Sequence, residues 1–152
     1  ARPNDINLNY AVSDINAEAD LYFYHESSPI NTLDINVSKY QKAKIKEVKK
    51  IKTKTLDNIL NDINLYQKID YMNIDVEGHE EKILNSFNIK KYQPRVISIE
   101  YLDLKMKELH FKNNDINNLL NSNLYKFFVN NNYYFVNWLH GDLIFIHESF
   151  RD

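Results

Sequence analysis

The sequence predicts an α/β protein built on a mixed β-sheet, and three observations support this class. Apolar segments of strand length alternate with segments whose apolar residues recur at helical spacing. Two of the predicted buried strands, one beginning at Lys68 and one at Pro94, each reach an acidic residue at their carboxyl end. The chain closes with aromatic strands around His140-Gly141-Asp142, which is typical of an antiparallel hairpin at a sheet edge.

Length and composition limit the functions that are open to the chain. Its 152 residues, 43% of them hydrophobic, suffice for about one domain with one core. The net charge of −2 gives no general attraction to nucleic acid or to an anionic membrane. The chain has no cysteine, which fits a cytoplasmic location, and no apolar segment long enough for a membrane span. We therefore expect a single cytoplasmic domain.

The first third of the chain predicts strands over 7–14 and 19–24, which could form a hairpin, and then a Ser-, Pro- and Asn-rich loop from His25 to Val37. Between Lys39 and Lys54, lysines such as Lys42 alternate with smaller or apolar residues. This pattern suits either a phosphate-binding patch or the solvated face of an antiparallel strand. The second interpretation is favoured, because the aromatic side chains of a single-strand nucleic-acid binder are absent there.

The rest of the chain continues the alternation of helices and strands. Residues 55–63 predict a helix with Thr55 as its cap and with one apolar face. A strand, a turn at Gly78 and a second helix follow, and then the strand that begins at Pro94. The last part predicts a helix from Asp115. Strands are expected near 125–129, 133–136 and 143–147.

The acidic residues after the two buried strands mark the candidate site. Ligands of α/β sheets bind beyond the carboxyl ends of the strands, where Asp75, Glu77 and Glu100 are expected. His79, Glu77, Glu80 and Asp75 can also be considered as metal ligands. Neighbouring residues in one turn seldom converge on an ion, however, and the spaced histidine pair of a helical zinc site is missing. No metal is therefore expected, and Glu80 suits a structural role in the first turn of the helix equally well.

Several motifs together resemble the FkbM family of S-adenosylmethionine-dependent methyltransferases. They are the Asp-Val-Glu-Gly-His-Glu segment at 75–80, the preceding Lys-Thr-Leu-Asp at 54–57 and the Pro-Arg-Val-Ile-Ser-Ile-Glu segment at 94–100. Residues 7–14 are similar to the family's strand that leads into an Ala-Val-Ser-Asp turn. The resemblance covers nearly the whole chain.

The resemblance implies a Rossmann-like class I methyltransferase sheet, with S-adenosylmethionine as cofactor and a hydroxyl of a sugar or other small metabolite as acceptor. It places four residues beside the adenine, although a plain turn would explain the last two of them equally well: Ala11, Val12, Ser13 and Asp14.

Methyl transfer to a hydroxyl needs an aligned acceptor oxygen and a base. Asp75 is the first choice to face the cofactor and the acceptor, and Glu77 or His79 is the candidate base. Glu100 could orient the substrate or cap the neighbouring loop.

One feature of the family is missing from this sequence. Family members carry a Gly-rich cofactor loop after their first strand and an acid after their second, whereas the only glycines here are Gly78 and Gly141. The resemblance also places those two strands between the strand near Asn9 and the strand near Ile74. We therefore expect a sheet that is incomplete at its N-terminal side, a chain truncated at that end, weak or no cofactor binding, and exposed edges that invite self-association into a homo-oligomer.

Two alternatives from other functional classes remain. The missing loop suits a catalytically inactive remnant or a partner-binding domain, and the cluster at 75–80 would suit a metal-dependent hydrolase. The identity of the acceptor depends on the loops at 25–37 and 101–114, whose composition does not distinguish a sugar from a lipid or a peptide.

Overall fold

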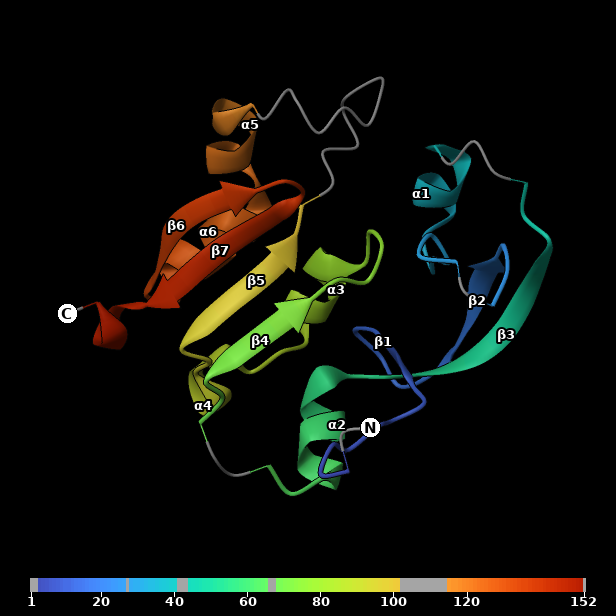
Figure 1. The fold of residues 1–152 in the computed structure, drawn as a ribbon, viewed down its shortest axis with the longest axis horizontal. Helices are drawn as coiled ribbons and strands as arrows, with labels where there is room; N and C mark the ends of the chain where they lie inside the picture. The colour runs from blue at the N-terminus through green and yellow to red at the C-terminus, as the bar shows by residue number, and fades with distance from the viewer. Residues whose placement is uncertain (1–2, 27, 41–43, 66–67, 102–114, 152) are drawn as a thin grey trace.

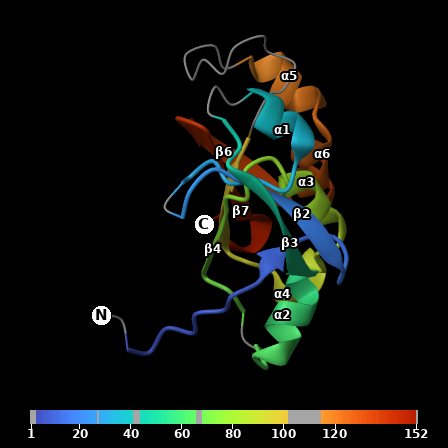
Figure 2. The same cartoon turned by 90° about the vertical axis from the view of Figure 1, so that its right-hand side faces the viewer.

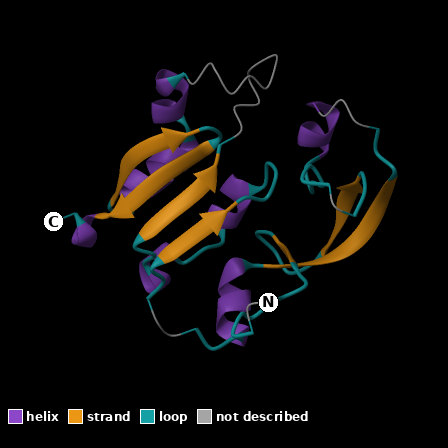
Figure 3. Cartoon of the chain, viewed as in Figure 1, coloured by secondary structure: helices purple, strands orange, loops and turns teal. Residues whose placement is uncertain are grey.

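The computed structural model describes residues 3–26, 28–40, 44–65, 68–101 and 115–151. The described residues form an α/β structure with two mixed sheets, in the strand orders β1-β3-β2 and β4-β5-β7-β6 (Figures 1 and 3). The elements, in chain order, are β1 Ala11–Val12, β2 Glu18–Phe23, α1 Ile35–Tyr40, β3 Glu47–Lys54, α2 Leu56–Asp62, β4 Tyr71–Ile74, α3 Glu80–Asn85, α4 Ile89–Tyr92, β5 Val96–Glu100, α5 Ile116–Asn121, α6 Asn123–Asn130, β6 Tyr133–Leu139, β7 Asp142–His147 and the 3-10 helix η1 Glu148–Phe150.

The larger sheet contains the core. β4 and β5 are parallel, β7 runs antiparallel to β5, and β6 forms the expected hairpin with β7 at the sheet edge. Helices α3, α5 and α6 lie on one side of this sheet (Figure 2). Alternate strand residues on that side are fully buried, for example Ile97, Leu143 and Phe145, and Phe128 of α6 stacks on Phe145 with ring centroids 4.2 Å apart. The period-two pattern of the strands therefore builds the core, as expected.

The smaller sheet is polar. Its central strand β3 pairs antiparallel with β2, so that Lys50 lies opposite Asp20 and Lys52 lies opposite Glu18. The Lys50 ammonium and the Asp20 carboxylate are 2.6 Å apart, and the Lys49 ammonium lies 3.4 Å from the centre of the Phe23 ring. Lys49 and Lys50 thus contact side chains of β2 on a solvated surface, which confirms the interpretation as the solvated face of an antiparallel strand for the described residues.

Helix α2 confirms the clearest helix prediction. Thr55 has extended backbone angles, and its side chain accepts a hydrogen bond from the backbone N–H of Asn58 at 3.3 Å, so it is the N-cap. Ile59 and Leu60 are buried. In the first turn of α2, the Asp57 carboxylate accepts a hydrogen bond from the backbone N–H of Asn88 at 2.8 Å. Helix α2 therefore connects the smaller sheet to the segment around α4.

Four sequence predictions differ from the structure. The strand expected over 7–14 is limited to β1 at Ala11–Val12, and α1 occupies the end of the loop expected from His25 to Val37. Residues 125–129 form part of α6 and not a strand, because Ser122 caps a helix there and Leu124 and Phe128, four positions apart, are buried together against the sheet. Their β-prone composition is overridden by this packing. Strands β1 and β2 do not form a hairpin either, since β3 lies between them and pairs with both.

Some predictions fall outside the described residues, namely the one on Lys42 and the loop expected at 101–114, of which only Tyr101 is described. His140 and His147 belong to the terminal hairpin, as expected, and His25 lies in an exposed loop. Across the part of the chain that the structure describes, no helix has both the length and the apolar character needed to cross a membrane.

Candidate functional site

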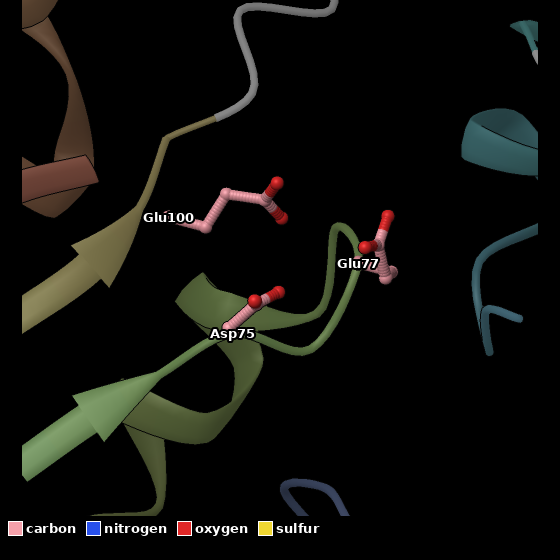
Figure 4. Close-up of side chains that lie close together, drawn as sticks. All are labelled: Asp75, Glu77 and Glu100. Atoms are coloured by element: carbon pink, nitrogen blue, oxygen red, sulfur yellow. The ribbon is translucent and has the colours of Figure 1, made fainter. Parts of the chain in front are cut away.

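The candidate site lies at the carboxyl ends of β4 and β5. Because these strands are parallel and Ile74 pairs with Ile99, the next residue of each segment lies at the same edge of the sheet. These residues are Asp75, directly after β4, and Glu100, the last residue of β5. Glu77 comes from the loop after β4. Figure 4 shows the three carboxylates turned toward a common space, and one oxygen of each lies within 4.8 Å of the others. The structure thus brings together the three acidic residues that the sequence singled out.

The carboxylates differ in exposure and in protonation. Asp75 is exposed, whereas Glu77 and Glu100 are partly buried. Burial raises the pKa of Glu77 to about 7, and the nearby charges of Asp75 and Glu80 act in the same direction. Burial also raises the pKa of Glu100 to about 8, with further contributions from the surrounding acids Glu77, Glu80, Asp75 and Asp142. Glu100 Oε2 is buried and has no hydrogen-bond partner among the described residues. At neutral pH the cluster therefore holds protons.

The loop that carries Glu77 has an unusual backbone. Glu77 has φ 52°, a left-handed conformation that is uncommon for a residue with a side chain, and Gly78 follows with φ 93°. Glu80 stabilises this loop from the first turn of α3, because its Oε1 accepts from the backbone N–H groups of Val76 at 3.1 Å and Gly78 at 3.3 Å. Burial raises the pKa of Glu80, although these hydrogen bonds favour its charged form. The geometry of Glu80 is that of a loop-stabilising residue.

Two residues that the sequence analysis did not single out also hold the loop. The Thr32 hydroxyl donates to the Glu77 carbonyl oxygen at 2.6 Å. Val37 of α1 packs directly on Gly78, where an added Cβ would lie 2.2 Å from Val37 Cγ2. The single sequence signal was the glycine itself, which indicates a positive φ or a close neighbour without saying which residue is near.

Ser13, Asp14 and His79 form a second group beside the acidic cluster. Ser13 and His79 are both buried, and Ser13 Oγ lies 3.1 Å from His79 Nε2 and donates to Asp14 Oδ1 at 3.0 Å. His79 Nε2 therefore donates to Ser13 Oγ. Burial lowers the pKa of His79, and the charge of Lys82 acts in the same direction. His79 is neutral at pH 7 and is held in the junction between the two sheets.

The remaining predicted cofactor residues belong to β1. Ala11 and Val12 pair in parallel with Thr53 and Lys54 of β3, and both are partly buried. Ser13 follows them directly and contacts His79. The end of β1 and the loop after β4 are therefore neighbours, although the two strands belong to different sheets.

The metal-ligand set considered from the sequence differs from the set that converges in space. Glu80 Oε1 is occupied by backbone N–H groups and His79 Nε2 by Ser13. Among the residues that the structure describes, the carboxylates with oxygens within 4.8 Å of one another are those of Asp75, Glu77 and Glu100. Acidic groups are common in this arrangement without an ion, so the spacing alone does not indicate a metal.

The converging carboxylates lie beyond the carboxyl ends of two parallel strands, which is where α/β domains commonly bind their ligands. A family model described as the methyltransferase FkbM domain matches residues 1–127. The chain therefore belongs to the FkbM methyltransferase domain family, and this membership indicates methyl transfer as its general chemistry. Comparison with the curated proteins gave no match, and neither did comparison with the solved structures.

Proposed function

We propose that this chain is an S-adenosylmethionine-dependent O-methyltransferase domain that acts in the cytoplasm on a hydroxyl of a sugar or other small metabolite. The observation that carries the proposal is the convergence of Asp75, Glu77 and Glu100 beyond the carboxyl ends of two parallel strands. The family match supplies the type of reaction.

The acidic cluster fits the charge of the proposed cofactor. S-adenosylmethionine, when bound, supplies an activated methyl group on a positively charged sulfonium. Carboxylates attract a cation without a metal, and a cation beside Glu77 and Glu100 would offset the burial that now raises their pKa values. We assign Asp75 to the side that faces cofactor and acceptor, because it is the most exposed of the three.

The protonation states suggest roles in handling the acceptor proton. With a pKa of about 7, Glu77 has nearly equal charged and neutral populations at neutral pH, which suits a general base. Glu100, with a pKa of about 8, holds its proton and can donate a hydrogen bond to an acceptor oxygen. We favour Glu77 over His79 as the base, since His79 Nε2 donates to Ser13 and its basic nitrogen, Nδ1, is buried with no hydrogen-bond partner among the described residues.

The strand order supports a Rossmann-like methyltransferase sheet. β4-β5-β7-β6, with β7 antiparallel to β5, is the arrangement expected for the reversed terminal strand of that sheet. By the same reasoning we assign Ala11, Val12, Ser13 and Asp14 to the adenine side. The Ser13 hydroxyl already has two partners, so Asp14, which is exposed, is the better candidate for a contact with the cofactor.

One observation favours the inactive or partner-binding alternative. Among the described residues, β4 pairs only with β5, and β1 pairs only with β3, so each has an unpaired edge. The sequence also contains no Gly-rich loop that could hold the methionine part of the cofactor. We propose that further strands complete this sheet in an active enzyme, or that a partner or a second copy of the chain pairs with these edges.

Calorimetric titration with S-adenosylmethionine and S-adenosylhomocysteine tests the proposal. The chain should be compared with a version extended upstream, if the gene encodes one. Binding that Asp75→Asn weakens would support it. Asp70→Asn is the matched control, because Asp70 lies just before β4 at its other end with its side chain 84% exposed. Absence of binding by both forms would favour a non-catalytic domain.

A further inference from the structure

The peptide unit between Glu77 and Gly78 is held at both of its polar atoms. Its carbonyl oxygen, on Glu77, accepts from the Thr32 hydroxyl at 2.6 Å. Its N–H, on Gly78, donates to Glu80 Oε1 at 3.3 Å. Since a peptide unit is planar, fixing both atoms fixes the orientation of the whole plane, and with it the φ of Gly78 and the ψ of Glu77. The direction of the Glu77 side chain depends on this backbone.

Thr32 is well placed to act as a fixed donor. It is 1% exposed, and its backbone N–H and carbonyl form a two-way bridge with Tyr22 of β2, at 3.4 and 2.9 Å. Its hydroxyl also accepts from the backbone N–H of Asp34 at 2.9 Å. The Thr32 hydroxyl proton is thereby directed toward Glu77, and the smaller sheet supplies the rigid support.

The conformation that Thr32 holds is one that the loop would not adopt unaided. Positive φ at a residue with a side chain costs of the order of 1 kcal/mol or more and persists only where the surroundings impose it. Here the surroundings are Thr32, Glu80 and Val37, and only Glu80 belongs to the same segment of the chain as Glu77.

We propose that Thr32 is a positioning residue for the acidic cluster, which places the Glu77 carboxylate next to Asp75 and Glu100 by fixing the Glu77 carbonyl. The proposal rests on the proposed function, because a role in methyl transfer requires that function. The structural part can be measured separately from it.

The experiment follows the carboxyl carbons of Glu77 and Glu100 by NMR through a pH titration of the chain. Thr32→Val replaces the hydroxyl with a methyl group, which cannot approach an oxygen at 2.6 Å, and so displaces the carbonyl. Thr32→Ala removes the donor without adding bulk, in case the valine variant does not fold. Thr32→Ser keeps the hydroxyl and should restore the wild-type titration.

Thr53→Val is the matched control. Thr53 is also a buried threonine of the smaller sheet, 3% exposed, and its hydroxyl donates to the Ile15 carbonyl oxygen at 2.8 Å. Among the described residues, the Thr53 hydroxyl forms hydrogen bonds with the backbone of Ile15 and Ala17, which lie outside the loop that carries Glu77. A general loss of stability would affect both valine variants, whereas a positioning effect would appear only at position 32.

We expect the pKa of Glu77 to fall by at least about half a unit in Thr32→Val and Thr32→Ala, because a released loop lets water reach the carboxyl group. Thr32→Ser and Thr53→Val should titrate like the wild type. Unchanged titration in a folded Thr32→Val or Thr32→Ala variant would overturn the proposal, as would an equal change in Thr53→Val. If the Thr32 variants shift the pKa of Glu77 but no form of the chain binds cofactor, the positioning role stands and the proposed function fails. If the chain binds cofactor but the Thr32 variants titrate like the wild type, the positioning role fails and the proposed function stands.

Discussion

The two sheets of this molecule differ in the kinds of residues that form them. The β4-β5-β7-β6 sheet is covered on one side by helices and has a core of fully buried residues such as Ile97, Ile99, Leu143 and Phe145. The β1-β3-β2 sheet has charged residues along its central strand, with Lys50 and Asp20 paired in solvent. Burial of apolar surface stabilises a fold far more than exposed ion pairs do. The larger sheet therefore supplies most of the stability.

The smaller sheet has a different role, which is visible where the two sheets meet. The loop after β4 lies between them (Figure 1). The larger sheet positions this loop, because the loop begins at the carboxyl end of β4. The side of the smaller sheet contributes the hydrogen bond from Thr32 to Glu77 and the contact between Ser13 and His79. The larger sheet therefore stabilises the fold, and the smaller sheet shapes the candidate site.

The largest effect should come from the core of the larger sheet. Phe128 is 0% exposed and stacks on Phe145, so Phe128→Ala should lower the free energy of unfolding by about 3–5 kcal/mol. Val48→Ala in β3, where the side chain is 52% exposed, should change it by less than about 0.5 kcal/mol. Urea denaturation of both variants measures the difference. Equal losses would show that the two sheets contribute alike.

Substitution at the junction should rank second. Gly78→Ala places a methyl group against Val37 at a residue with φ 93°, and the combined overpacking and backbone strain should cost about 2–3 kcal/mol. Adding Val37→Ala relieves the clash but not the strain, so the double variant should lose less than the sum of the single losses. Strict additivity in urea denaturation would mean that Val37 does not limit this position.

The acidic cluster should make the larger sheet less stable as the pH rises. The pKa of Glu100 is about 8 in the folded protein, against 4.5 for an ordinary glutamate. Between pH 4.5 and about pH 8 the folded state therefore binds more protons than the unfolded state. Stability therefore falls as the pH rises from about 4.5 through about 8. Glu100→Gln should flatten this dependence and stabilise the protein at pH 8 by about 1 kcal/mol, allowing for partial exposure.

Thermal unfolding at several pH values measures this effect. Asp142→Asn is the control, since Asp142 opposes Glu100 across β5 and β7 and contributes only the last of the charges that raise its pKa. A wild-type stability that rises between pH 5 and pH 8, with the same slope in Glu100→Gln, would contradict the prediction.

The cap of α2 should have a smaller effect. Thr55→Ala removes the side-chain acceptor for the Asn58 N–H and should cost about 1 kcal/mol, whereas Thr55→Ser should stay close to the wild type. Ser122→Ala is the equivalent change at α6, the helix that packs on the larger sheet, because Ser122 Oγ accepts a hydrogen bond from the backbone N–H of Tyr125 at 3.1 Å. Denaturation midpoints compare the two caps, and a Thr55→Ala protein as stable as the wild type would show that water replaces the hydroxyl.

The smallest effect is expected on the surface of the smaller sheet. Lys50→Gln removes the pairing with Asp20, but the lysine side chain is 69% exposed, so no measurable change in the denaturation midpoint is expected at physiological salt. A clear loss of stability, abolished by high salt, would show that the ion pairs of β3 matter more than the comparison of the two sheets implies.

Much of the larger sheet and its site could be predicted from the sequence because the signals are local. The strand before Asp75 and the strand before Glu100 are short apolar runs that end in acids, and parallel neighbours must bring those ends together. The cap at Thr55 and the turn at His140 and Gly141 are equally local. The strand predicted at 125–129 is wrong because the residue types there favour a strand, whereas the Ser122 cap and the packing of Phe128 on Phe145 favour a helix.

Local patterns in the chain are therefore sufficient to predict the α/β class, the acids at the strand ends, the family and the solvated face of β3. Three features became visible only in the folded molecule: β3 lies between β1 and β2, Glu80 stabilises the loop after β4, and Thr32 donates to the carbonyl of Glu77. The difference lies in the range of the interactions. Periodicity, caps and turns act over a few residues, whereas Thr32 and Glu77 are 45 positions apart and meet only after both sheets have formed.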